Sequence, residues 1–370
     1  MQVITKGEIG GAQTHVLTLC QALASRVRFM AAIGGLSCRS ALGDELQKGG
    51  IAVYPLPELI NSLSPLQLLA AVHALRRLIR EHQPDIVHAH SSVAGVVARI
   101  ACRIAGTPVV YTVHGFGFKP EAPRLQRWAA WMAEWPLARI TDRMICVSEH
   151  ERHLARRLPI APDRLSVVLN AVADTSEKAC PHHQPTRVVM VARLASPKRH
   201  DLLLRGLALI RRQLGQEVPV SLIGSGPELE PCRALARVLD LEAVEFVGDV
   251  SDVPERLAQH HIFVLMSDHE GLPISIIEAM RAGLAIVASD LPGIRELVTH
   301  RVHGLLVGND AQALADALLS LVSDSDLRAR LGHAARQQYE ARFTPAQMAD
   351  AVKALYDQIA RHEPARHHTH

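Results

Sequence analysis

The sequence of 370 residues is poor in aromatic side chains and contains no long apolar run. Phe, Trp and Tyr make up only 4% of the chain, and no stretch of about 18 apolar residues lacks a charge. The opening residues "MQVITKGEIGG" have neither the basic nor the apolar segment of a signal peptide. We therefore expect a cytoplasmic protein without a membrane-spanning helix.

Cysteine pairs are also missing. The six cysteines are widely scattered, without any Cys-x-x-Cys spacing, at positions 20, 38, 102, 146, 180 and 232. This argues against a zinc site or a disulfide framework and predicts reduced, buried thiols.

The composition is that of a well-filled globular protein, with 48% hydrophobic and 21% charged residues. The length favours two domains over a single core. The formal net charge of +3 divides unevenly, because residues 1–174 contain 19 Lys and Arg against 13 Asp and Glu, whereas the remainder has 21 against 24. The basic N-terminal half indicates either an anionic partner on that side or a chance difference.

Short apolar runs alternate with longer periodic segments, which is typical of parallel sheets covered by helices. The strand-like runs are "MQVIT", "VRFMAAIG", "AVYPL", "DIVHAH", "PVVYTVHG", "RMICVS" and "LSVVLN", then "RVVMVAR", "PVSLIG", "VEFVG", "IFVLMS", "AIVASD" and "GLLVG". The pattern predicts two Rossmann-like, doubly wound α/β domains facing each other across a cleft, with ligands beyond the carboxyl ends of the strands.

The boundaries follow from composition. The segment 173–186, "ADTSEKACPHHQPT", is polar and contains proline without an apolar period, as an interdomain linker would. We expect an N-terminal domain at 1–172, a C-terminal domain at 187–345, and a helix at 346–362 that packs back toward the N-terminal domain. The residues 363–370 complete the chain as a tail.

The first loop that could bind a ligand is "GEIGGAQT" (7–14). Gly10 and Gly11 there would let a phosphate approach backbone amides at the start of a helix. The loop does not fit Gly-x-Gly-x-x-Gly, and no acidic residue ends the next strand, so a dinucleotide site is poorly supported. A simple tight turn is the alternative.

A second loop is "YTVHGFGF" (111–118), in which His114 ends an apolar strand. A histidine at the carboxyl end of a strand would face the ligand side of such a sheet and contact a sugar hydroxyl or a reacting group. A structural histidine remains the alternative.

Two loops open the second domain. In "VARLASPKRHDLLL" (191–204), Arg193 and Lys198 form a natural pair for a diphosphate, whereas Arg199 and His200 are expected to face solvent. In "LIGSGPELE" (222–230), the glycines 224 and 226 suit backbone approach to a phosphate or nucleoside, although the same turn type is common.

The stretch "HEGLPISIIEAM" (269–280) places two glutamates around the start of a helix. Pro273 is expected as the first helical residue, with Glu270 in the loop before it and Glu278 inside the helix. The free amides between them suit an anion. Both glutamates could also be ordinary solvated residues.

The order of these signals resembles glycosyltransferase family 4, which has the GT-B fold. The resemblance covers residues 3 to 345 and is most specific in "SDHEGLPISIIEAMRAGLAIVASDLPGIRELV" (267–298). The segment "VLNAVAD" (168–174) is similar to the family's Asn-Gly-Val-Asp ending of the first domain, with Ala171 replacing the glycine.

The resemblance implies a catalytic set of His114, Arg193, Lys198 and Glu270. Arg193 and Lys198 would bind the donor's diphosphate and stabilise the charge that develops on it. Glu270 would face the donor sugar, and His114 would contact that sugar near the reacting carbon.

The resemblance also implies a donor-binding set. Glu278 would bind the ribose hydroxyls, main-chain groups would lie beside sugar and phosphate, and Gly11 would approach donor phosphate or acceptor from the other domain. The full set is Gly11, Gly224, Gly226, Val250, Gly271, Leu272, Pro273 and Glu278, where Val250 belongs to a segment that reads the base through its main chain.

The implied reaction is retaining transfer from a UDP-sugar or GDP-sugar, without a metal ion or other cofactor. Family members retain anomeric configuration without an obvious protein nucleophile, so none is named. The chain has no Asp-x-Asp beside an apolar strand that would demand a metal.

The acceptor side is less specified. The tryptophans at 128, 131 and 135 have a helical spacing that places them on one face, and Arg76, Arg77 and Arg80 form a second basic face in the same domain. If these residues and Gly10 mark the acceptor side, the helix would lie at the inner surface of the cytoplasmic membrane, and the acceptor would be a polyprenyl-linked saccharide in surface-polysaccharide assembly. If the tryptophans instead pack into the core, a soluble acceptor fits better. No nucleic-acid partner is expected.

Two alternatives of another class stay open: a GT-B epimerase acting on the nucleotide-sugar itself, and a non-catalytic nucleotide-sugar-binding protein. The combination of Arg193, Lys198, Glu270 and Glu278 favours transfer. A nicotinamide oxidoreductase is a distant third because the glycine fingerprint is missing.

Overall fold

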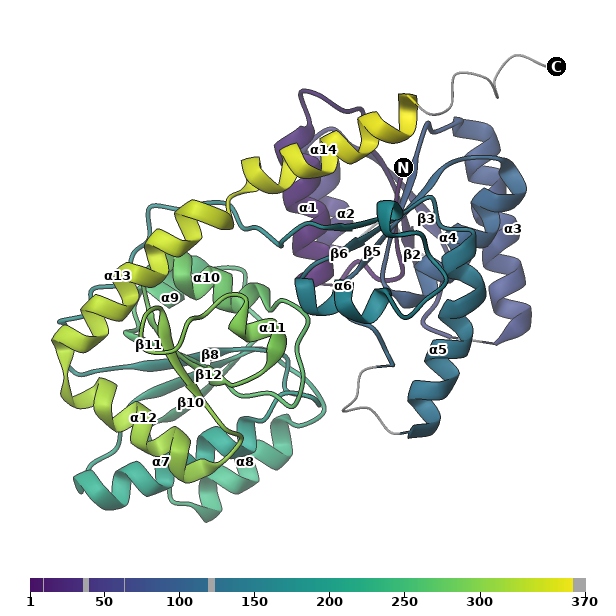
Figure 1. Cartoon of the computed structure of the whole chain (residues 1–370). Helices are drawn as coiled ribbons and strands as arrows, with labels where there is room; N and C mark the ends of the chain where they lie inside the picture. Colours follow the sequence, from purple (N-terminus) through teal and green to yellow (C-terminus); the bar gives the residue numbers. More distant parts are fainter. Residues whose placement is uncertain (9, 36–39, 63, 119–123, 362–370) are drawn as a thin grey trace. The chain divides into compact units, whose positions relative to one another are not determined.

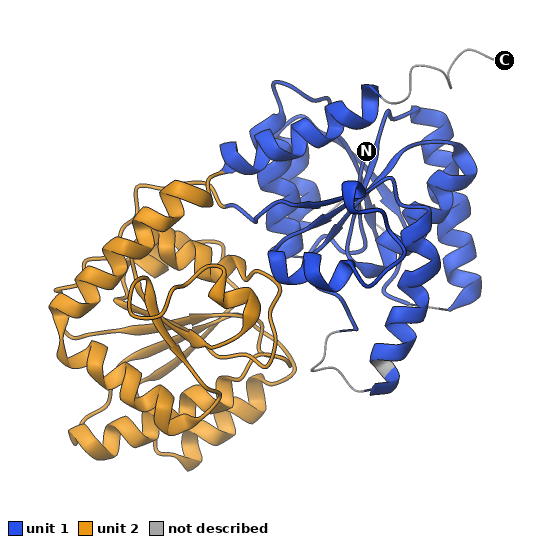
Figure 2. Cartoon of the chain, in the orientation of Figure 1, with its two compact units in different colours: residues 1–171, 345–370 blue, residues 172–344 orange. Residues whose placement is uncertain are grey.

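The chain folds into two compact α/β units, each built on a parallel sheet, as a computed structural model shows (Figures 1 and 2). The structure describes residues 1–8, 10–35, 40–62, 64–118 and 124–361. Unit 1 comprises Met1–Ala171 and the C-terminal segment from Pro345, and unit 2 comprises Val172–Thr344. The expected tail at 363–370 lies outside the described residues.

The sheet of unit 1 is seven-stranded and parallel throughout. Its residues alternate between two buried faces, so nearly every strand position is apolar. The strands lie in the order β3 (Ala52–Leu56), β2 (Met30–Gly34), β1 (Gln2–Ile4), β4 (Val87–His90), β5 (Val109–Val113), β6 (Arg143–Cys146) and β7 (Leu165–Val167).

Helices cover both faces of this sheet. Residues such as Val3 and Ala32 pack with one group of helices, and Ile4 and Ile33 pack with the other. The first group contains α3 (Pro65–His82), α4 (Ser92–Ala105), α5 (Arg124–Arg139) and α6 (Glu149–Ala155). The second contains α1 (Gly11–Leu23), α2 (Ala41–Lys48) and the C-terminal α14 (Pro345–Arg361), which lies beside α1 in Figure 1. A single 3-10 turn, Pro162–Arg164, precedes β7.

Unit 2 repeats the plan with a six-stranded parallel sheet. Its strands lie in the order β10 (Val244–Gly248), β9 (Val220–Ile223), β8 (Val188–Val191), β11 (Ile262–Leu265), β12 (Ala285–Ser289) and β13 (Gly304–Val307). Its helices are α7 (His200–Leu214), α8 (Leu229–Val238), α9 (Val253–Ala258), α10 (Ile274–Ala282), α11 (Pro292–Arg295), α12 (Ala311–Ser323) and α13 (Ser325–Arg342).

Each sheet has one point where the strand order reverses. In unit 1 this point lies between β1 and β4, and in unit 2 between β8 and β11. At such a point the loops leaving the two carboxyl ends diverge to opposite faces, which opens a crevice for a ligand. The strand order therefore places the residues 5–8, after β1, and 192–199, after β8, at these crevices.

The segment 173–186 differs from the expected linker, because it packs on unit 2. Ala179 donates its amide to the Ala282 carbonyl at 2.8 Å, and Arg336 makes two 2.6 Å hydrogen bonds to Asp174. The fully buried Arg328 donates to the carbonyl of Pro181 at 3.0 Å. These arginines lie on α13, about 150 residues further along the chain, so local composition could not indicate the packing.

Of the cysteines, those at 20, 102, 146 and 232 are buried thiols, Cys180 is exposed, and Cys38 lies outside the described residues. Among the helices that the structure describes, none has both the length and the apolar character needed to cross a membrane.

Candidate active site

In unit 2, the loops that follow β8 and β11 are joined into one surface. Lys198 and Ser267 form an isolated antiparallel bridge, and the amide of Arg199 donates to the Met266 carbonyl at 2.9 Å. The Ser267 hydroxyl donates to the Pro197 carbonyl at 3.2 Å. Side chains from two loops about 70 residues apart are thus held together at the topological switch point.

Lys198 and Glu270 face each other across this surface. Their side chains form an ion pair and are only 18% and 10% exposed, so the pair is largely shielded from water. The sequence predicted both residues but not this contact. Arg193, in the same loop as Lys198, is exposed and makes no ion pair with any residue that the structure describes. Its charge is available to an anion.

The expectation that Arg199 and His200 face solvent is wrong. Arg199 is half-buried and forms ion pairs with Asp201 at 2.9 Å and with Asp268 at 3.0 Å. His200 is 2% exposed, and burial, together with the smaller effect of the Lys198 charge, lowers its pKa to about 4. Asp268 comes from the loop after β11, and Asn309 donates to it at 3.2 Å. Sequence reasoning did not single out Asp268, although it stands in the stretch 267–298, and it missed Asn309, which lies outside the motifs.

The loop after β9 needs its two glycines because it packs closely against the backbone of another loop of the protein. A Cβ at Gly224, where φ is +130°, would lie 2.3 Å from the Ala192 carbonyl, and one at Gly226 would lie 2.3 Å from that of Leu194. These carbonyls flank Arg193. The two glycines therefore let this loop pack under the Arg193 loop, and Val250, half-buried in the next loop, follows the strand beside it.

A third glycine with this property was not singled out from the sequence. A Cβ at Gly293 would lie 2.0 Å from the carbonyl of Gly271. The short helix α11 thereby supports the buried segment of Gly271, Leu272 and Pro273 from below. The tripeptide "LPG" (291–293), which forms the N-cap and first two residues of α11, was the available signal.

Helix α10 begins one residue later than expected. Pro273 is its N-cap, with φ −67° and ψ 118°, and Ile274 is the first helical residue. Glu278 projects from the second turn and is half-buried. Burial raises the pKa of Glu278 to about 7, against a smaller lowering by Arg281. No hydrogen bond joins its carboxylate to a residue in the described part of the chain. The half-buried carboxylate of Glu278 can therefore accept hydrogen bonds from a ligand.

In unit 1, the corresponding edge carries a cluster of histidines. His114 follows β5, is half-buried, and its Nε2 lies 3.3 Å from Nδ1 of His90 on β4. The ring of His15, from α1, packs edge-on against that of His114 with centroids 5.1 Å apart. Gly10 and Gly11 begin α1 at the same edge, as N-cap and first helical residue. His15, His88 and His90 were not predicted, although the "HAH" sequence of β4 was a signal.

The tryptophan face predicted for α5 is divided in the structure. Trp128 is 62% exposed, whereas Trp131 packs against the core and Trp135 lies under the guanidinium of Arg139, 3.5 Å from the ring centroid. The apolar face that α5 exposes is instead Leu125, Trp128 and Met132. The reason is a buried ion pair between Arg99 and Glu134, at 2.7 Å, which sets the rotation of the helix.

The basic face predicted for α3 is also smaller than expected. Arg77 and Arg80 are exposed, but Arg76 is half-buried with its Nε enclosed. Position 76 lies one residue from the buried Leu75, on the flank of the core-facing stripe.

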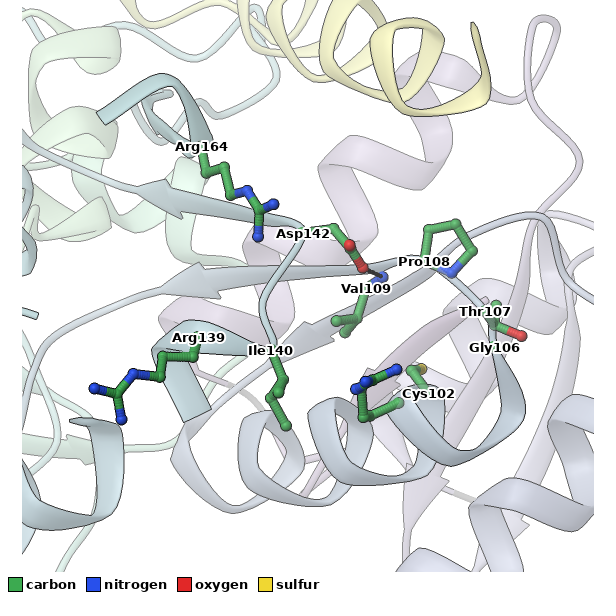
Figure 3. A pocket seen from close by; sticks show the side chains of 10 residues that line it. Cys102, Gly106, Thr107, Pro108, Val109, Arg139, Ile140, Asp142 and Arg164 are labelled. Carbon is green, nitrogen blue, oxygen red and sulfur yellow. Dashed lines mark hydrogen bonds between the residues drawn. The ribbon is translucent and has the colours of Figure 1, made fainter. Parts of the chain in front are cut away.

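A cavity of 330 Å³ lies in unit 1, away from these loops (Figure 3). Asp142 and Val109, which are joined there by a 2.8 Å hydrogen bond, stand with Arg164 at the amino ends of β5, β6 and β7. Since the strands are parallel, this cavity is at the sheet edge opposite the histidines, and we assign it no part in catalysis.

Two family models match the chain. "Glycosyltransferase Family 4" matches residues 9–176 and "Glycosyl transferases group 1" matches residues 174–338. The chain belongs to the family 4 glycosyltransferases. Its enzymatic class is therefore glycosyl transfer from a nucleotide-sugar, as predicted.

Curated relatives agree over most of the chain. It is 28% identical to a "UDP-Gal:alpha-D-GlcNAc-diphosphoundecaprenol alpha-1,3-galactosyltransferase" of Escherichia coli, covering 83% of this chain and 84% of that protein. It is also 28% identical to a "Phosphatidyl-myo-inositol mannosyltransferase" of Mycobacterium leprae, covering 95% and 94%.

Solved structures confirm the GT-B fold. Anabaena HepE in complex with UDP and glucose superimposes with a TM-score of 0.82 at 23% identity, covering 96% of this chain and 98% of that one. Sucrose-phosphate synthase of Thermosynechococcus elongatus gives a TM-score of 0.84 at 20% identity, covering 98% and 99%. Among the described residues of this glycosyltransferase, no group of three His, Cys, Asp or Glu is placed to hold a metal ion.

Proposed function

We propose that this glycosyltransferase moves a sugar from a UDP-sugar or GDP-sugar, with retention of configuration and without a metal ion, to a polyprenyl-diphosphate-linked saccharide in surface-polysaccharide biosynthesis. The surface around Lys198 and Glu270 carries the donor part of the proposal. An exposed Arg193, a shielded lysine and the start of α10 supply three sources of positive potential for a diphosphate.

The roles of individual residues follow from this donor. Lys198 leaves Glu270 for the diphosphate, which frees the Glu270 carboxylate to accept from sugar hydroxyls. Glu278 accepts from the ribose hydroxyls, and these donors would stabilise the carboxylate whose pKa burial raises. His114 contacts the sugar near the reacting carbon, and the leaving diphosphate assists deprotonation of the acceptor.

The outer surface of unit 1 supports the lipid-linked acceptor. Seven of the ten exposed large apolar residues of the described chain are in this unit, against three in unit 2. They are Ile60, Leu66, Leu69, Ile104, Leu125, Trp128 and Met132. Exposed arginines at 77, 80, 103 and 124 accompany them on α3, α4 and α5. Apolar side chains with arginine favour the interface of an anionic membrane, and the name of the Escherichia coli relative specifies a diphosphoundecaprenol acceptor.

The donor is tested by calorimetric titration of the protein in EDTA with UDP-glucose, UDP-galactose, UDP-N-acetylglucosamine and GDP-mannose. We expect one of these to bind without added metal. The product formed on a polyprenyl-diphosphate-linked N-acetylhexosamine should carry the anomeric configuration of the donor. Binding that requires Mg²⁺ or Mn²⁺, or an inverted product, would contradict the proposal.

The membrane part is tested by cosedimentation with vesicles. Trp128→Glu should reduce binding to phosphatidylglycerol vesicles at least tenfold, because a charge replaces an interfacial ring. Val238→Glu is the matched control, since Val238 is also an exposed apolar residue but belongs to unit 2. Equal losses for both variants, or no binding of the parent protein, would remove the membrane surface from the proposal.

A further inference from the structure

Four histidines of unit 1 lie within one buried cluster below the edge that carries His114. They are His15 on α1, His88 and His90 on β4, and His114 after β5. The rings of His88 and His90 are 4.2 Å apart between centroids, and those of His90 and His114 are 5.6 Å apart. The cluster is joined to the C-terminal helix through Tyr356.

The hydrogen bonds of His88, His90 and His114 form one continuous chain, whereas His15 pairs with Asn170 at 3.0 Å. His114 Nε2 lies 3.3 Å from His90 Nδ1, and His90 Nε2 lies 2.8 Å from Gln2 Oε1. Gln2 Nε2 lies 3.2 Å from the Tyr356 hydroxyl, which lies 2.6 Å from His88 Nδ1. The chain ends where His88 Nε2 meets Thr112 Oγ1 at 2.7 Å.

Each ring in the chain is neutral and therefore carries one hydrogen. Burial lowers the pKa of His88, His90 and His114 well below the ordinary range, and the neighbouring histidines add to the effect. A neutral imidazole donates from one nitrogen and accepts at the other, so the position of each hydrogen is decided by its partners.

The orientation of the Gln2 amide determines which ring nitrogen of His90 and of His114 carries the hydrogen. Gln2 Oε1 only accepts, so His90 must donate from Nε2 and keeps a bare Nδ1. His114 must then donate from Nε2 to that Nδ1, which leaves Nδ1 of His114 as an acceptor. Reversing the amide would reverse the bonds of His90 to Gln2 and to His114, and would place the hydrogen of His114 on Nδ1.

We propose that Gln2 and Tyr356 are positioning residues that fix His114 as its Nε2–H tautomer, so that Nδ1 accepts a hydrogen bond from a hydroxyl group of the sugar being transferred. This rests on the proposed contact between His114 and the donor sugar. The Gln2 amide donates to the Tyr356 hydroxyl, which also contacts Nδ1 of His88, so the C-terminal helix supplies the acceptor that holds the amide in this orientation. Neither Gln2, 2% exposed, nor Tyr356, 7% exposed, needs to touch a substrate.

The tautomer is measured directly by nitrogen NMR of the full-length protein labelled at histidine, with the His114 signals assigned by their loss in His114→Gln. In the parent protein, His114 should carry its hydrogen on Nε2. In Gln2→Met, His90 loses its acceptor, so the Nδ1–H form of His114 should become populated. Tyr356→Phe should have the same effect in part. A parent protein with the hydrogen on Nδ1, or variants with an unchanged tautomer, would overturn the proposal.

Activity supplies the second readout. Gln2→Met should lower kcat about tenfold, the effect of one lost hydrogen bond, with the donor KM nearly unchanged. Tyr339→Phe is the matched control, because Tyr339 in unit 2 also donates a buried hydroxyl, to Val172 at 3.0 Å, but lies outside the chain. It should lose similar stability while keeping kcat and the His114 tautomer. If no donor is turned over but the tautomer shifts as expected, the proposed function fails and the positioning chain stands. If Tyr339→Phe lowers kcat as much as Gln2→Met does, the hydrogen-bonded chain has only a structural role.

Discussion

At the residue scale, Glu278 combines burial with the absence of a described hydrogen-bond donor, and this should cost stability. Its pKa rises from an ordinary 4.5 to about 7. The free energy of unfolding is therefore highest, as far as Glu278 affects it, below about pH 4.5, where the carboxyl is protonated. It falls as the pH rises through 7 and the buried group ionises. We predict that Glu278→Gln is more stable than the parent by about 1–3 kcal/mol at pH 8. Urea unfolding at both pH values measures this, and the difference should vanish at pH 4.5.

The same residue should reverse its effect when the donor binds. Ribose hydroxyls donate to the ionised carboxylate, so binding favours the form that is scarce below pH 7. We predict that donor affinity of the parent rises several-fold between pH 6 and pH 8, whereas Glu278→Gln binds more weakly and without this pH dependence. Titration calorimetry decides. A pH dependence that survives in Glu278→Gln would assign it to another group.

Lys198 should matter more for turnover than for donor affinity. The structure pairs its charge with Glu270, and in the proposed reaction Lys198 turns to the diphosphate as negative charge develops there. We predict that Lys198→Met lowers kcat about 10²–10³-fold and changes the donor dissociation constant much less. Lys178→Met is the control, because Lys178 also pairs with a carboxylate of unit 2, Asp174 at 2.9 Å, but lies outside the site loops. A loss of donor affinity with kcat unchanged would instead assign Lys198 to uniform binding of donor and transition state.

At the element scale, one ion pair orients α5. Arg99 is fully buried, makes hydrogen bonds of 2.7 and 3.0 Å to Glu134, and lies 4.3 Å from the centre of the Tyr111 ring. Gly95 provides the space, because a Cβ there would lie 2.5 Å from that ring. The pair fixes which apolar residues α5 turns outward.

Removing one partner of this pair should be more harmful than removing both. Arg99→Met leaves the Glu134 carboxylate buried without a cation, and we predict a loss of about 3–5 kcal/mol in the free energy of unfolding. Adding Glu134→Leu should restore most of it. Lys353→Ala, which breaks the exposed pair with Asp357, should cost under about 1 kcal/mol. Urea unfolding compares the three, and a double variant as unstable as Arg99→Met would contradict the account.

The positions of the strands could largely be predicted from the sequence. The rotation of a helix about its own axis could not. The thirteen strands that the structure describes all fall on predicted apolar runs, because most of them are buried on both faces and are therefore largely apolar. Arg193, Lys198 and Glu270 were found because they follow strand ends. The rotation of α5 depends on Arg99, and the burial of His200 and the pairing of Arg199 depend on unit 2 packing, including Asp268. Such contacts join positions far apart in the chain, so the local spacing of residues does not indicate them.

At the scale of the whole molecule, the chain returns to its first unit only in its last helix. Unit 2 is continuous over Val172–Thr344, but unit 1 needs α14 to cover one face of its sheet. The apolar residues that α14 buries there are Met348, Ala349, Val352, Leu355, Tyr356 and Ile359. Their transfer from water is worth roughly 8–15 kcal/mol as an upper estimate, comparable to the entire stability of a typical domain.

Deleting α14 should therefore unfold one unit and spare the other. In a chain ending at Thr344, we predict that amides of β1, β2 and α1 lose their protection from hydrogen exchange, because α1 and the sheet face beneath it are uncovered. Amides of β8, β11 and α10 should remain protected, since every strand of that sheet is retained. Hydrogen exchange with mass spectrometry compares this chain with the full-length protein. UDP or GDP should still protect the loop at Lys198 and Glu270 if unit 2 alone binds the nucleotide, whereas loss of protection throughout both units would mean that they fold as one cooperative body.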